Sequence, residues 1–201
     1  MRLARLLWQL VRNPRHEVYY GAGPMLMSAL RKRWVIFMNP HATIEFGPDV
    51  HVGPGFSLHV RGGGTFRVGA RTEIRRGFRA EIYDGATLTI GEDCVMSYDV
   101  LIACSSSVEI GNHVGLGQAT ALYDGAHLWR DLTKPPMRQG FDLRPIKIGD
   151  YVSVYSKVTI TSDIGERAAV GAHAFVNRPV PPYTLATGVP ATPKESFGPP
   201  S

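Results

Sequence analysis

The chain has few cysteines, no long apolar run and almost no acid near its N-terminus. Its 201 residues include two cysteines, Cys94 and Cys104, which lie ten positions apart without a CxxC or histidine-paired spacing. We therefore expect free, buried thiols in a reducing compartment rather than a disulfide framework. No stretch approaches the roughly eighteen apolar residues of a transmembrane helix. The basic N-terminus has no small-residue cleavage site, so no secretory signal is predicted.

The charge of the chain is unevenly distributed. Residues 1–40 contain seven Lys or Arg and a single acid, Glu17, for a net charge of +6. The other 161 residues contain 15 bases and 16 acids, for a net charge of −1. The basic character thus belongs to an N-terminal extension. A nearly neutral body argues against a nucleic-acid groove, so no nucleic-acid partner is expected.

The main positive signal is an internal repeat. Six times in the chain, an apolar residue followed by glycine begins a set of apolar residues spaced six apart, as in Ile90, Met96 and Ile102. A smaller residue often lies four positions after the first one, such as Cys94 after Ile90. Three six-residue segments make one triangular coil of about eighteen residues, whose inward side chains form a core only when coils stack. An apolar residue followed by glycine opens six such sets: Phe46-Gly47, Val68-Gly69, Ile90-Gly91, Ile110-Gly111, Ile148-Gly149 and Ile164-Gly165.

This period predicts an all-β fold, a parallel β-helix of about six coils over residues 43–180. A basic, partly helical extension precedes it at 1–42, and a Pro-rich C-terminal tail follows at 181–201. A β-sandwich with glycine turns is the alternative, but sandwich strands alternate with a period of two. Successive coil starts lie 22, 22, 20, 38 and 16 residues apart, so extra residues are expected to leave at corners.

The N-terminal extension contains two apolar, basic stretches. The second runs from Met25 to Met38. Two interpretations stay open: a cap that covers the first coil, or an interfacial helix on an anionic membrane. The first stretch ends before Asn13-Pro14 and has apolar residues at helical spacing: Leu3, Leu6, Leu7, Leu10 and Val11.

The 38-residue spacing contains a long insertion at residues 123–145. It holds His127, Trp129, several charged residues and three prolines. It is followed directly by the next repeat, which begins at Ile148-Gly149. Long insertions inside compact domains are usually functional or disordered. We therefore expect a corner loop that carries functional residues.

At this point the chain resembles the hexapeptide-repeat acyltransferases, over about residues 44–191. With His127 at its start and Pro145-Ile146-Lys147-Ile148-Gly149 at its end, the loop is similar to the maltose and galactoside acetyltransferase branch. The resemblance implies left-handed coils, a homotrimer with sites between two prisms, and acetyl-CoA as co-substrate without a metal. It also implies that a hydroxyl of a sugar, glycan or glycolipid is acylated. His127 would be the general base that removes the hydroxyl proton while the hydroxyl oxygen attacks the thioester directly. The ordinary pKa of histidine suits this task.

Other residues are expected in the site by the same resemblance. Ser97 and Asp99 would bind the acceptor, and Asp99 could instead orient His127. Ser97 replaces a common Asn, and Ser153-Val154-Tyr155 replaces a usual Trp-Ile-Gly sequence. The expected coenzyme contacts are the Ser156 backbone amide at the thioester oxygen, Ala172 beside the pantetheine arm, and Asn177, Arg178 and Lys194 near the phosphates.

Two other functions are weighed against an enzyme of this family. A non-catalytic β-helix scaffold or binding module would explain the departures at Ser97 and Ser153. A γ-type carbonic anhydrase shares the fold but needs three histidines around a metal, and no His-x4-His pair occurs in consecutive coils. We expect a cytoplasmic protein of polysaccharide or glycolipid synthesis. The membrane interpretation adds peripheral contact with the inner membrane face through residues 1–38.

Overall fold

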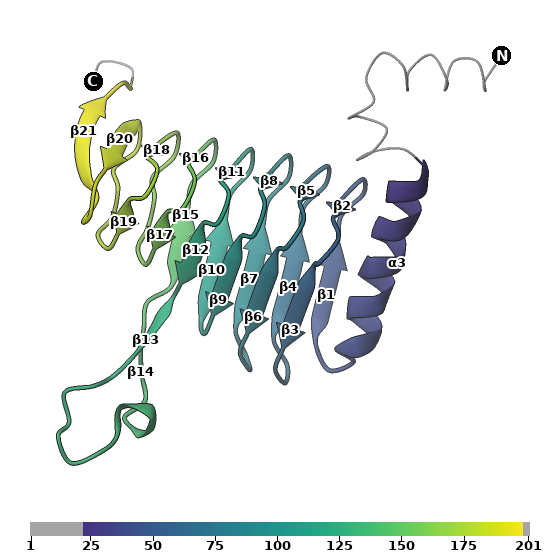
Figure 1. Cartoon of the computed structure of the whole chain (residues 1–201), viewed down its shortest axis with the longest axis horizontal. Coiled ribbons are helices and arrows are strands. Elements are labelled where there is room, and N and C mark those ends of the chain that lie inside the picture. Colours follow the sequence, from purple (N-terminus) through teal and green to yellow (C-terminus); the bar gives the residue numbers. More distant parts are fainter. Residues whose placement is uncertain (1–21, 199–201) are drawn as a thin grey trace.

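The computed structural model describes residues 22–198. The chain forms a three-sided prism, a helix across its N-terminal end and a hairpin that projects from one edge (Figure 1). Each face of the prism is a sheet of mainly parallel strands. Successive strands visit the three sheets in turn, so each sheet gains one strand per coil. The predicted all-β, parallel architecture is confirmed.

The three sheets run the length of the stack. The first contains β1 (Thr43–Phe46), β4 (Thr65–Val68), β7 (Thr87–Ile90), β10 (Ser107–Ile110) and β15 (Ile146–Ile148). The second contains β2 (His51–Val52), β5 (Glu73–Ile74), β8 (Val95–Met96), β11 (Gly115–Leu116), β16 (Ser153–Val154), β18 (Ala169–Val170), β20 (Thr184–Thr187) and β21 (Thr192–Ser196). The third contains β3 (Ser57–Val60), β6 (Arg79–Ile82), β9 (Leu101–Cys104), β12 (Ala121–Tyr123), β17 (Thr159–Ile160) and β19 (Phe175–Val176).

The strand register follows the sequence repeat. All six apolar residues that precede the repeat glycines lie side by side in one column, Phe46 beside Val68 and so on to Ile164. The positions six and twelve residues later form two further columns, such as Met96 beside Leu116 and Ile102 beside Leu122. Nearly all these side chains are buried, so stacking supplies the core.

Close backbone approach explains the repeat glycines. A Cβ atom added at Gly47 would lie 2.7 Å from the Ala70 nitrogen, and one at Gly69 would lie 2.6 Å from the Glu92 nitrogen. Only glycine leaves room for the next coil there. The left-handed backbone of this corner falls two positions later, on residues such as Asp93 (φ 53°). The glycine is thus required by contact between coils, not by its own φ.

The stack extends past residue 180, where the sequence analysis ends it. Val180 bridges to Ile164, and β20 pairs in parallel with β18. The final strand, β21, turns back antiparallel on β20 and covers that edge of the second sheet. Much of the expected Pro-rich tail is therefore part of the fold. The repeat is hard to recognise here because Pro181, not glycine, follows Val180.

Helix α3 (Ala22–Met38) covers the first coil. Ser28 Oγ accepts a hydrogen bond of 2.8 Å from the Val52 amide, and Arg31 donates to the Val52 carbonyl at 3.0 Å. Lys32 donates to the Val50 carbonyl at 2.9 Å. These side chains satisfy backbone groups at an otherwise open sheet edge, which bears out the cap interpretation for this helix. The other predicted helical stretch, at 3–11, lies outside the described residues.

Among residues 22–198, no helix is long and apolar enough to cross a membrane. The two cysteines are free and buried, as expected. Burial raises the pKa of the Cys104 thiol to about 12, and it also raises the pKa of the Cys94 thiol.

Candidate functional site

The 123–145 insertion forms a hairpin rather than an irregular loop. Strand β13 (Gly125–His127) pairs antiparallel with β14 (Phe141–Leu143), and a short 3-10 helix, η1 (Pro136–Arg138), lies beyond them. We call residues 124–145 the arm. It leaves the prism after β12 and returns before β15, at the edge between the third and first sheets (Figure 1).

A buried carboxylate fixes the base of the arm. Asp124 is 1% exposed, and its Oδ1 accepts a hydrogen bond of 2.5 Å from the Ser105 amide. Its Oδ2 accepts hydrogen bonds from the Ser106 amide at 2.7 Å and the Ser106 hydroxyl at 3.0 Å. The Asp124 carbonyl also accepts from the Arg144 amide at 2.7 Å. One residue thus ties both ends of the arm to the corner between β9 and β10.

His127 lies at the end of β13, three residues beyond this anchor. Its ring centroid lies 4.2 Å from that of Phe141, its partner across the hairpin. Phe141 in turn lies 6.4 Å from the ring of Tyr83, on the same edge of the prism. The imidazole is half-buried, and its Nδ1 is buried without a hydrogen-bond partner among residues 22–198. Buried polar atoms are normally paired, so this nitrogen requires a partner.

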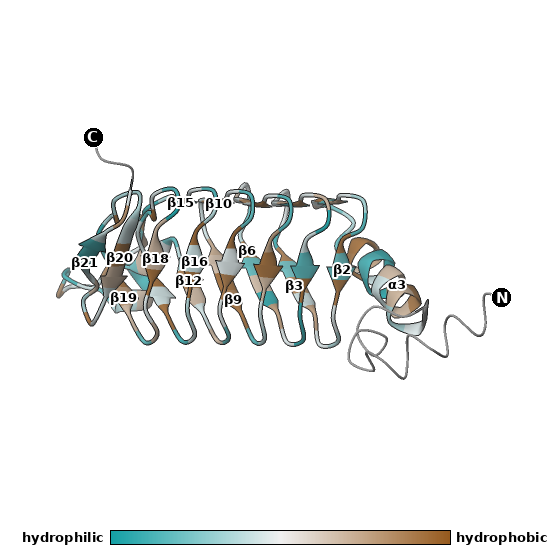
Figure 2. Ribbon diagram, turned by 90° about the horizontal axis from the view of Figure 1, so that it is seen from above, coloured by the Kyte–Doolittle hydropathy of each residue, from teal (hydrophilic) through white to brown (hydrophobic). Residues whose placement is uncertain are grey.

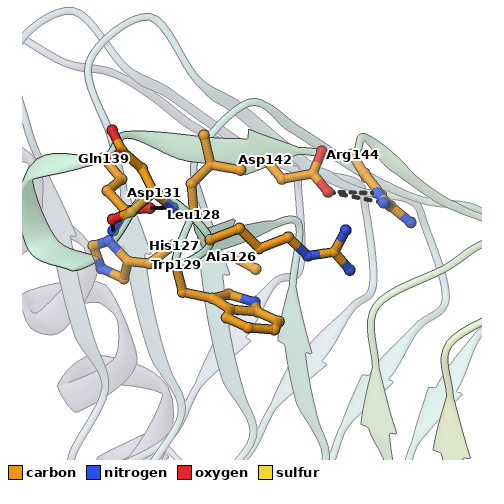
Figure 3. A pocket seen from close by; sticks show the side chains of 9 residues that line it. Ala126, His127, Leu128, Trp129, Asp131, Gln139, Asp142 and Arg144 are labelled. Carbon is orange, nitrogen blue, oxygen red and sulfur yellow. Dashed lines mark hydrogen bonds and ion pairs between the residues drawn. The ribbon is translucent and has the colours of Figure 1, made fainter. Parts of the chain in front are cut away.

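The arm encloses a cavity of about 520 Å³ (Figure 3). Gln139 holds its tip, since its amide accepts from the Asp131 nitrogen at 2.9 Å and donates to the Asp131 carbonyl at 2.8 Å. Trp129 is 66% exposed, and the Arg130 guanidinium lies 5.3 Å from its ring centroid. The cavity therefore combines a histidine, an aromatic surface and charges of both signs. Its lining consists of Ala126, His127, Leu128, Trp129, Arg130, Asp131, Gln139, Asp142 and Arg144.

A second cavity of about 360 Å³ lies at the base of the arm. Arg144 donates to Asp142 at 2.8 Å, and both residues line the two cavities. Asn177, one of the expected coenzyme contacts, lines the second cavity with Phe175 and Thr161. The structure thus brings this residue beside the His127 arm within one chain. Arg178 follows at the same corner and is exposed.

Four other expected site residues lie on a different edge of the prism. Ser97 and Asp99 follow β8, Ser156 follows β16, and Ala172 follows β18, all between the second and third sheets. Ser156 and Ala172 are exposed in adjacent coils, and the Ser156 carbonyl accepts from the His173 amide at 3.0 Å. Within one chain, this group is separated from His127 by the width of the third sheet.

Two expectations are not met within the single chain. Asp99 does not orient His127 through Nδ1, because that atom has no partner among the described residues. Lys194 lies in β21, on the second sheet, and not with Asn177 and Arg178. Residues 22–198 also contain no cluster of three or more His, Cys, Asp or Glu side chains suited to a metal ion.

Sequence reasoning missed Asp124 and Gln139. An aspartate followed by glycine just after a strand is typical of a turn, and nothing in the sequence pairs it with Ser105 and Ser106, eighteen or more residues earlier. The bonds of Gln139 depend on the path of the arm, which no repeat predicts.

Comparisons with known proteins identify related chains. A probable acetyltransferase of Mycobacterium tuberculosis is 27% identical over 92% of this chain and 56% of its own length. The galactoside O-acetyltransferase of Escherichia coli is 29% identical over 53% of this chain and 52% of its own length. A hexapeptide-repeat acetyltransferase of Vibrio cholerae, solved with acetyl coenzyme A, is 28% identical with a TM-score of 0.56, covering 84% of this chain and 78% of that chain.

The chain is thus similar to the hexapeptide-repeat acetyltransferases. The predicted resemblance to this family and to its galactoside acetyltransferase branch is confirmed, and the predicted co-substrate is the one bound in the Vibrio cholerae relative. This hexapeptide-repeat protein spans about half the length of the curated relatives it matches. No protein-family model matches it.

Proposed function

We propose that the protein is a coenzyme-A-dependent O-acetyltransferase that acts on a sugar, glycan or glycolipid hydroxyl. The observation that carries the proposal is the position of His127. It lines a cavity of about 520 Å³ in an arm anchored to a hexapeptide-repeat prism. The galactoside O-acetyltransferase relative supports a sugar acceptor. The exposed Trp129 ring supplies a flat apolar surface of the kind that packs against a sugar ring.

In this proposal His127 acts as general base. It removes the proton of the acceptor hydroxyl while that oxygen attacks the thioester carbonyl, and the coenzyme thiolate leaves as the tetrahedral intermediate collapses. The Ser156 amide stabilises the oxyanion, an interaction worth about 3–4 kcal/mol in other enzymes. No protein nucleophile is needed, because the thiolate is a good leaving group. Asn177 and Arg178 contact the coenzyme phosphates, and Ser97 and Asp99 bind the acceptor.

We infer that the active site is completed by a neighbouring subunit of a homotrimer of left-handed prisms. Two observations support this arrangement. His127 and Ser156 lie on different edges of their own prism, so a single chain does not bring base and oxyanion donor together. In addition, the buried Nδ1 of His127 has no partner among residues 22–198, which fits a hydrogen-bonding group supplied from outside the chain.

A coenzyme-release assay with acetyl-CoA and a panel of sugars, nucleotide sugars and glycolipids tests the proposal. Wild type is expected to release coenzyme A with at least one acceptor. His127→Ala should lower turnover by about 10²–10⁴-fold, the usual contribution of a general base. His59→Ala, which changes an exposed histidine on β3, is the matched control and should keep full activity. Near wild-type turnover in His127→Ala would exclude His127 as the base.

A non-catalytic scaffold is the second candidate. It is favoured by Ser153-Val154-Tyr155, which departs from the usual Trp-Ile-Gly sequence beside the expected thioester site. Binding of acetyl-CoA without transfer to any acceptor would favour this role. The cytoplasmic location remains a prediction, and so does membrane contact through residues 1–38, for which the outer face of α3 provides a structural argument.

A further inference from the structure

Helix α3 has an apolar stripe on the side that faces away from the prism. Leu26, Leu30, Trp34 and Phe37 are 62%, 50%, 61% and 73% exposed. Their spacing of four, four and three residues places them on one side of an α-helix. The rings of Trp34 and Phe37 lie 6.0 Å apart, so the stripe is continuous at its C-terminal end.

The side of α3 that contacts the prism is the more polar one. Ser28, Arg31 and Lys32 bond to the backbone of the first coil, and Val35 is the buried apolar contact. Figure 2 shows the helix at the end of the stack, with both hydrophobic and hydrophilic residues along it. Large apolar side chains that lie together on an exposed surface usually mark an interaction site. We therefore expect another surface to cover the stripe.

Charge indicates what covers the stripe. Helix α3 contains Arg31, Lys32 and Arg33 but no acid, and Arg33 is exposed beside the stripe. Residues 1–21 add four arginines against the single acid Glu17. A second copy of the helix, or the chain's own N-terminal residues, would therefore bring like charges together. An anionic lipid surface provides both an apolar layer for the stripe and opposite charge for the arginines.

We propose that the outer stripe of α3 docks the protein on an anionic lipid surface. The helix lies across the end of the stack (Figure 1), so a helix lying in the membrane plane would hold the prism with its end toward the surface. In the proposed trimer, three such helices would face the same way and bind together. The docking itself does not depend on catalysis, so its test is independent of the proposed activity.

Sedimentation of the full-length protein with lipid vesicles tests this inference. Vesicles of phosphatidylcholine with about one-third phosphatidylglycerol should retain the protein, and raising the salt concentration should weaken retention. Vesicles of phosphatidylcholine alone should bind it at least tenfold more weakly. Leu30→Asp/Phe37→Asp should reduce binding to anionic vesicles by at least tenfold, because both changes place carboxylates in the stripe.

The matched control is Leu132→Asp/Met137→Asp, which makes the same kind of change at two exposed positions of the arm. It should bind vesicles as wild type does. Both double variants should keep the wild-type melting temperature, which shows that the prism is intact. Three results would overturn the inference: no vesicle binding by wild type, equal binding to neutral vesicles, or unchanged binding by Leu30→Asp/Phe37→Asp. A change of oligomeric state in that variant, without vesicle binding by wild type, would instead show that a second copy covers the stripe.

Discussion

The anchor at the base of the arm gives the sharpest prediction about stability. Replacing Asp124 with asparagine keeps the size of the side chain but removes its charge and one of its two acceptor oxygens. Whichever way the amide is turned, its NH₂ group then faces a backbone amide of Ser105 or Ser106, which are both donors. At least one buried hydrogen bond to a charged group is lost, and its donor is left unpaired.

Hydrogen bonds to charged groups contribute about 1.5–3 kcal/mol each. We therefore expect Asp124→Asn to lower the free energy of unfolding by about 2–4 kcal/mol. Ser106→Ala, the matched control, removes only the hydroxyl bond of 3.0 Å and should cost about 1 kcal/mol. The double variant should lose less than the sum of the two, because both single changes remove hydrogen bonds from the same cluster around the Asp124 carboxylate.

Urea denaturation of the four proteins, followed by circular dichroism, measures these differences. The slope of the transition should stay the same if only native-state bonds change. The reasoning is refuted if Asp124→Asn unfolds at the wild-type urea concentration, or if it costs no more than Ser106→Ala. Either result would mean that solvent satisfies the Ser105 and Ser106 amides equally well.

Three further predictions concern the assembly, the coenzyme wall and the thiols. Sedimentation should show a trimer at micromolar concentration, and a monomer would contradict the shared site. Ala172→Tyr should change the free energy of unfolding by no more than about 1 kcal/mol, because Ala172 is exposed at a corner. In calorimetry it should nevertheless weaken acetyl-CoA binding by at least tenfold. Unchanged affinity would show that the pantetheine arm lies elsewhere. At pH 8, Cys94 and Cys104 should react with a thiol reagent only after unfolding. Both thiols are buried, and their raised pKa values keep them protonated. Rapid modification of the folded protein would refute this.

The columns of the prism could be predicted from the sequence because they depend on local spacing alone. The apolar residues that precede the repeat glycines share one column from Phe46 to Ile164, and the positions six and twelve residues later follow from the period of six. The same logic fails after Val180, where a proline replaces the repeat glycine while the stack continues. A sequence repeat thus predicts the coils but not how the last edge is covered.

The candidate site was less predictable because it depends on contacts between distant segments. The position of His127 at the start of an insertion is visible in the sequence, but its anchor through Asp124 to Ser105 and Ser106 is not. The resemblance implies a site between two prisms, which agrees with Ser156 lying on another edge, but it gives no sign that Asn177 shares a cavity with the arm.

Calorimetric titration of acetyl-CoA into the full-length protein tests the central claim most directly. The account predicts saturable binding of one acetyl-CoA per chain. It predicts similar affinity for His127→Ala, because a general base acts on the acceptor proton and not on the coenzyme. Absence of binding by folded wild-type protein would contradict a coenzyme-A-dependent enzyme and leave the prism as a scaffold.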